Sequence, residues 1–69
     1  MAYEEIMKKR EALEKRRREI DKEIWPLYEA DYLSSEEKER FEKLSREYQI
    51  LNDEDTKLVN DLIKTLKKN

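Results

Sequence analysis

The 69-residue sequence contains no glycine, no cysteine and no histidine, and it has a single proline, Pro26. The lack of cysteine rules out disulfides, and the lack of both cysteine and histidine removes the usual ligands of a structural zinc site. The lack of glycine removes the residue that tight hairpin turns and phosphate-binding loops require. A disulfide-rich miniprotein, a zinc domain, a β-rich fold and a nucleotide-binding loop are therefore all disfavoured.

Groups suited to catalysis or metal binding are also scarce. Ser34 and Ser35 have no candidate base and are interpreted as helix caps, while Glu36 and Glu37 suit the first turn of a helix, where carboxylates favour the dipole. The acidic run 53–55 lacks the glycine and the spaced glutamate of a calcium-binding loop. We therefore expect a protein that is not an enzyme, with no cofactor and no metal.

The composition predicts helices. Charged residues make up 49% of the chain and apolar residues 36%, with a formal net charge of −2. A predominance of Glu, Lys, Arg and Leu is typical of coiled coils. A single domain over 1–69 is short for an independent core, so we expect oligomerisation to help stabilise it. No apolar run approaches the roughly 18–20 residues that span a bilayer, and we expect a cytoplasmic protein.

A first helix is predicted over about residues 3–31 from a heptad pattern. With Tyr3 as the first a position, all four d positions are apolar: Ile6, Leu13, Ile20 and Leu27. Two of the a positions are arginines, at 10 and 17. This three-four spacing predicts an amphipathic helix with a coiled-coil-like apolar seam.

Pro26 lies inside the first predicted helix. Its ring lacks an N–H and clashes with the carbonyl of Lys22, four residues earlier, so a kink or a break is expected. Because residues 28–31 keep the helical spacing, we expect a kinked helix that continues to about Asp31 rather than one that stops at the proline.

A second helix is predicted over about residues 35–67. Ser34 and Glu37 have the spacing of a capping box, in which each side chain accepts the backbone N–H of the other residue. Leu33, just before the cap, is placed to form a hydrophobic staple. The capping box therefore predicts where the second helix begins.

The segment 52–55 leaves two interpretations of the second helix open. Asn52 followed by three acidic residues can cap a third helix, which would divide the second one. Leu51 and Leu58, however, keep the same three-four spacing on both sides, with no glycine or proline between them. We therefore expect one continuous helix.

Two helices of similar length joined by a short turn favour an antiparallel helical hairpin. Residues 8–22 carry eight basic and four acidic residues, whereas 36–55 carry four basic and eight acidic ones. The hairpin brings these complementary stretches together. The expected layers run from the turn to the open end: Leu27 with Phe41, Ile24 with Leu44, Ile20 with Tyr48, Arg17 with Leu51, Leu13 with Asp55, Arg10 with Leu58 and Ile6 with Leu62.

Arginines occupy the middle of the expected helix interface. In this register Arg16, Arg17 and Arg18 face the segment between Glu47 and Asp55. Arg17 and Asp55 lie one layer apart, so we expect them to meet diagonally. A polar pair of this kind inside a seam can fix the register of two helices at some cost in stability.

The hairpin leaves apolar residues outside its seam, at both of its ends. They form a candidate surface for self-association or for a partner: Tyr3, Met7, Trp25, Tyr28, Tyr32, Val59, Ile63 and Leu66. If two hairpins pack with opposite orientations, the turn end of one covers the open end of the other. We therefore expect a homodimer that forms a four-helix bundle.

Two functional hypotheses follow. The first is a non-enzymatic helical interaction protein, such as an adaptor, regulator or inhibitor, that acts through protein–protein contacts. Its candidate contact for another protein is the aromatic cluster at 25–32. The alternative is a small dimeric regulator that binds RNA or DNA through the basic face of the first helix. Its candidate contacts are Lys8, Lys9, Lys15, Arg16 and Arg18. The interleaved glutamates, and the absence of aromatics that would stack on bases, weigh against this alternative.

Overall fold

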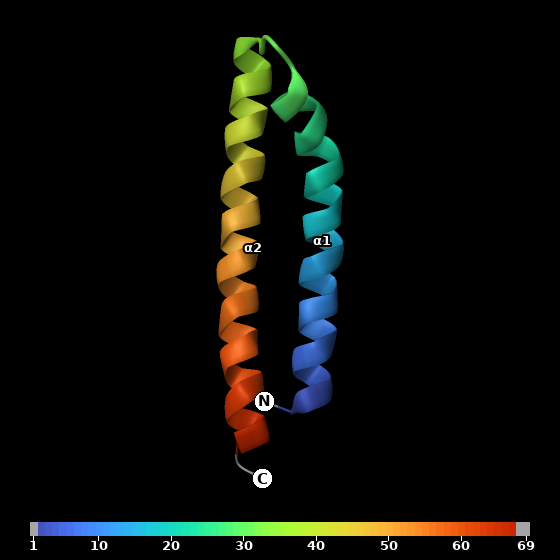
Figure 1. Cartoon of the computed structure of the whole chain (residues 1–69), viewed down its shortest axis with the longest axis vertical. Coiled ribbons are helices and arrows are strands. Elements are labelled where there is room, and N and C mark those ends of the chain that lie inside the picture. Colours follow the sequence, from blue (N-terminus) through green and yellow to red (C-terminus); the bar gives the residue numbers. More distant parts are fainter. Residues whose placement is uncertain (1, 68–69) are drawn as a thin grey trace.

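The protein is a hairpin of two long antiparallel helices, seen in a computed structural model that describes residues 2–67 (Figure 1). Helix α1 spans Tyr3–Glu29 and helix α2 spans Ser35–Lys67. The molecule measures 53 × 15 × 15 Å along its principal axes. The prediction of an all-α helical hairpin is confirmed.

Helix α1 runs through Pro26 without a break and ends at Glu29, two residues before the predicted Asp31. Ala30 has an extended backbone, with φ of −68° and ψ of 136°. The last turn has no basic residue, and the carboxylates of Glu29 and Asp31 are unfavourable near the negative end of the helix dipole. In Figure 1, the final turns of α1, which include the proline, bend toward α2.

Helix α2 begins with the predicted capping box. The Glu37 N–H donates to Ser34 Oγ at 3.2 Å, and the Ser34 N–H donates to Glu37 Oε1 at 3.0 Å. The helix then continues to Lys67 without interruption, so the alternative of a third helix at Asn52 is wrong. With no glycine or proline in the segment, Thr56 donates its hydroxyl to the Asn52 carbonyl while the helical hydrogen bonds continue.

The core is small and follows the predicted seam. Ile6 and Ile20 have no exposed surface, and the other buried apolar residues are Leu27, Leu44 and Leu58. Ile20, Leu27 and Leu44 form a cluster toward the turn, against which Leu33 also packs. Among the described residues, no polar or charged residue is fully buried.

Candidate interaction surface

Asp55 is the centre of the polar contacts between the two helices. Arg10 Nε donates to Asp55 Oδ1 at 2.9 Å, and Arg17 Nη1 lies 4.0 Å from Asp55 Oδ2. The predicted Arg17–Asp55 contact is therefore confirmed. Arg10 is a second partner that was not predicted, although the expected layers place it one layer from Asp55 on the other side. The Asp55 side chain is 19% exposed, and its hydrogen bond raises the pKa of Arg10. One carboxylate thus serves two arginines that lie seven residues apart on α1.

The second contact of Arg17 is with an aromatic ring. Its guanidinium carbon lies 5.4 Å from the centroid of the Tyr48 ring on α2, within the range of a cation–π interaction. Its Nε is buried and has no hydrogen-bond partner in the part of the chain that the structure describes. Arg17 is therefore held between Tyr48 and Asp55 with its donor capacity only partly used.

The other edge of the hairpin is closed by Arg16 and Glu47. Arg16 Nε and Nη2 both donate to the Glu47 carboxylate, the latter at 2.9 Å, and this contact lowers the pKa of Glu47. The prediction that Arg18 also faces α2 is wrong. Arg18 instead bonds Glu14 of its own helix at 3.0 Å, because it lies farther around α1 from the seam than Arg16 and Arg17 do.

Seven of the eight residues predicted for self-association are exposed. Their exposed fractions range from 38% for Met7 to 83% for Tyr32; the others are Tyr3, Trp25, Tyr28, Ile63 and Leu66. Val59 is half-buried against the hairpin. The structure adds Ile50, which is 57% exposed. In the sequence, Ile50 is an apolar residue outside the three-four spacing of the seam, and this position indicates that its side chain is exposed.

The aromatic residues near the turn reach across both helices. Trp25 stacks on Tyr28 with ring centroids 6.0 Å apart, and Tyr28 stacks on Phe41 of α2 at 6.5 Å. Tyr28 is nevertheless 70% exposed. The three rings therefore form an aromatic row that joins α1 to α2 while leaving a broad apolar surface open to a partner.

Exposed apolar residues from both ends of the hairpin follow one side of it: Met7 and Tyr28 on α1, and Ile63 on α2, which lies two i,i+4 steps from Asp55. On α1, Met7 and Tyr28 are three heptads apart and so occupy the same edge of a coiled-coil helix. Met7 lines a shallow depression that Arg10, Arg17 and Asp55 share, and the Tyr28 contact with Phe41 lies along the same edge. We call this side of the hairpin the shared face.

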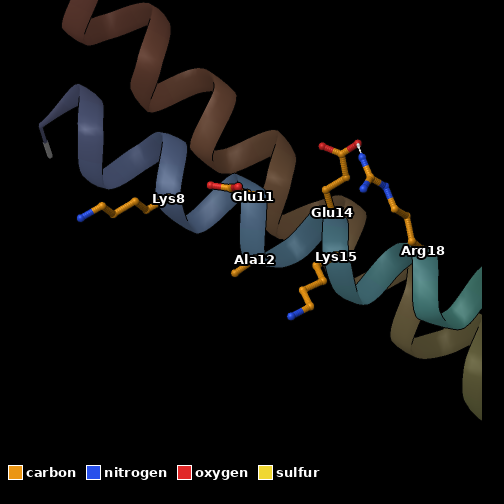
Figure 2. A pocket seen from close by; sticks show the side chains of 6 residues that line it. All are labelled: Lys8, Glu11, Ala12, Glu14, Lys15 and Arg18. Carbon is orange, nitrogen blue, oxygen red and sulfur yellow. Dashed lines mark hydrogen bonds and ion pairs between the residues drawn. The ribbon is translucent and has the colours of Figure 1, made fainter.

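The candidate nucleic-acid residues are not gathered into one basic strip. Figure 2 shows Lys8 and Lys15 extending from α1 away from α2, with Glu11 and Glu14 between them and Arg18 turned back to Glu14. Arg16 bonds Glu47 and Glu19, and Lys9 lines a different depression, beside Leu13 and Leu58. The five predicted contacts therefore alternate with acidic residues or pair with them.

No cluster of metal-binding side chains is present among the described residues. Within residues 2–67, no three acidic side chains are arranged to hold a metal ion. Asp53 and Glu54 are exposed, and Asp55 is occupied by the two arginines. No described helix is both long and apolar enough to cross a membrane.

The fold and the shared face define a class, a helical hairpin with one partly apolar side exposed. Comparisons with protein families, with curated proteins and with solved structures found no match.

Proposed function

We propose that the chain is a non-enzymatic helical interaction protein that self-associates into a four-helix-bundle homodimer. The single observation that carries this proposal is the shared face, on which apolar side chains from both ends of the hairpin remain exposed. In this role the protein acts in the cytoplasm as an adaptor, regulator or inhibitor, through protein–protein contacts made by the assembled bundle. It performs no chemistry of its own.

The surface area of the hairpin supports this proposal. The chain exposes 5903 Å², whereas a compact monomer of 8.6 kDa is expected to expose about 4,700 Å². The excess exceeds the roughly 800 Å² that each partner buries in a standard interface. A second hairpin on the shared face would remove area of this order and complete an apolar core that one hairpin leaves half open.

Sedimentation equilibrium of the wild-type chain at tens of micromolar tests the proposal. We expect a dimer mass, and we expect Ile63→Glu to shift it to a monomer because the substitution places a charge on the shared face. Ile50→Glu is the matched control, since Ile50 lies outside the seam and the shared face. A monomer mass for the wild type would contradict the homodimer, and equal masses for both variants would contradict the use of this face.

A further inference from the structure

The edge of α1 that borders the shared face carries an ordered stripe of eight residues. They are Tyr3, Met7, Arg10, Glu14, Arg17, Asp21, Ile24 and Tyr28. None is fully buried, and the side chains of Arg10, Arg17 and Glu14 are 35%, 31% and 60% exposed. The order is two apolar residues, then basic, acidic, basic and acidic residues, then two apolar residues. We call these residues the α1 stripe.

The α1 stripe is complementary to itself when its direction is reversed. Reversal about the midpoint between Lys15 and Arg16 sets Arg10 against Asp21 and Glu14 against Arg17, so that each charge meets the opposite charge. The same reversal sets Tyr3 against Tyr28 and Met7 against Ile24, so that each apolar residue meets another. Because a two-fold axis applies every pairing twice, all four charged residues of both copies are matched.

We infer that the second copy binds with its α1 antiparallel to this α1, centred between Lys15 and Arg16. This inference rests on the proposed homodimer and specifies its orientation and register. The turn of each hairpin then lies at the open end of the other. Charge complementarity selects this register, because a shift by one charged position opposes like charges.

The contacts within the hairpin show which part of α2 lies beside the proposed two-fold axis. The Arg10–Asp55 and Arg17–Tyr48 contacts bracket the midpoint of α1, which therefore lies opposite the part of α2 between Tyr48 and Asp55. On α2, Phe41 lies on the turn side of this point and Ile63 on the open side. The two-fold rotation therefore places the aromatic row of each copy against the apolar residues at the open end of the other copy, such as Ile63.

The alternative two-fold arrangement, with both turns at the same end, pairs α1 with α2 of the second copy. It offers Glu14 and Asp21 no basic partner, because the matching edge of α2 carries none. That edge consists of Phe41, Ser45, Tyr48, Asn52, Asp55 and Val59. In that arrangement the second copy offers no basic partner to Asp21, and Glu14 has only Arg18 of its own helix. The antiparallel pairing of α1 with α1 instead gives both carboxylates an arginine of the second copy, which favours it.

A charge-reversal variant tests the register. Glu14→Lys with Asp21→Lys makes the central stripe entirely basic. It leaves the Arg10 and Arg17 contacts with Asp55 in place and removes the exposed Glu14–Arg18 ion pair within α1. All four cross-copy pairs become repulsive, so we expect the dissociation constant to rise by at least about tenfold, with partial recovery in high salt. The matched control is Glu39→Lys with Asp53→Lys, which changes the net charge equally at exposed positions of α2 outside the shared face.

Two single-cysteine variants, Tyr3→Cys and Tyr28→Cys, test the orientation in a chain that has no other cysteine. We expect a disulfide-linked dimer when the two variants are mixed and oxidised, and little linkage in either alone. Rapid linkage of Tyr28→Cys with itself would overturn the inference in favour of turns at the same end. An unchanged dissociation constant in the lysine variant would overturn the register, while a wild-type monomer would instead overturn the homodimer itself.

Discussion

Asp55 is the residue whose surroundings differ most from those of the other carboxylates in this heavily charged chain. It lies between Arg10 and Arg17, with only 19% of its side chain exposed, whereas most other acidic residues are exposed. A partly buried carboxylate that accepts from arginine contributes more to stability than a surface ion pair does. Arg10 and Arg17 therefore depend on this one side chain for an acidic partner across the helix interface.

Replacing Asp55 by alanine is expected to lower the free energy of unfolding by about 1–2 kcal/mol, because Arg10 and Arg17 lose their shared acceptor. Urea unfolding followed by circular dichroism measures this change at a fixed protein concentration. Asp53→Ala is the control, and its effect is expected to stay within about 0.5 kcal/mol because Asp53 is exposed. If both variants lost the same free energy of unfolding, the contacts of Asp55 with the two arginines would have no stabilising role.

Glu37 links the helix cap to pH. Its hydrogen bond from the Ser34 backbone holds its pKa below the ordinary value of 4.5. Since the folded pKa is the lower one, the stabilisation is present above pH 4.5 and is lost as the pH falls through the folded pKa. We expect the urea midpoint to decrease between pH 5 and pH 3, in about the range where carboxylates titrate.

The glutamine variant isolates the contribution of Glu37. Glu37→Gln is expected to show a smaller decrease of the midpoint on acidification than the wild type, because it has no carboxylate to protonate. Glu36→Gln serves as the control and should keep the wild-type decrease. Identical pH dependence in the wild type and Glu37→Gln would contradict a contribution from the capping box.

At the scale of elements, the two helices depend on each other through a narrow seam. Long helices made of charged residues gain most of their stability from packing, and here only five residues among those described are buried. Along the seam, the apolar residues are interrupted by the polar residues Arg10, Arg17 and Asp55, which lie in three successive layers. Each buried apolar residue therefore carries a large share of the stability of the hairpin.

A matched pair of isoleucines measures that share. Ile20→Ala is expected to lower the free energy of unfolding by about 2–4 kcal/mol, because Ile20 has no exposed surface in the core cluster. Ile50→Ala removes the same atoms from a residue that is 57% exposed, and we expect a loss below about 1 kcal/mol. Chemical unfolding of both variants, at one protein concentration, provides the comparison.

Much of this element-level architecture was predictable from local signals, and the exceptions have physical causes. The heptad spacing predicted both helices, and Ser34 with Glu37 predicted where α2 begins. The end of α1 was placed two residues too late, because apolar spacing does not report the unfavourable carboxylates at a helix C-terminus. Arg18 was misplaced because consecutive arginines point in different directions around a helix.

At the scale of the whole molecule, the hairpin is long and thin, at 53 × 15 × 15 Å. Every residue of such a shape lies close to the surface, so one hairpin has no protected interior of its own beyond the seam. The aromatic row and the exposed apolar residues at the open end lie on the shared face, where a second layer of helices would create an interior. The whole-molecule shape thus gives the same indication as the shared face.

A self-associating hairpin should unfold in a concentration-dependent way. We expect the melting temperature measured by circular dichroism to rise when the protein concentration is increased 100-fold, because association favours the folded state. Ile63→Glu should remove most of this dependence, and Ile50→Glu should keep it. A melting temperature independent of concentration in the wild type would indicate that folding does not require a second copy.

The sequence by itself determined the helices, the cap between them and the charge alternation along α1, because these depend on neighbours within a few residues. Only the tertiary structure decided which residues share Asp55, how Tyr28 reaches Phe41, and which exposed apolar side chains lie on one side. These contacts join residues far apart in the chain, and their geometry depends on how two helices are rotated and bent against each other. Local spacing indicates which side of each helix forms the seam, but it does not give the rotation finely enough to assign the contacts beside the seam.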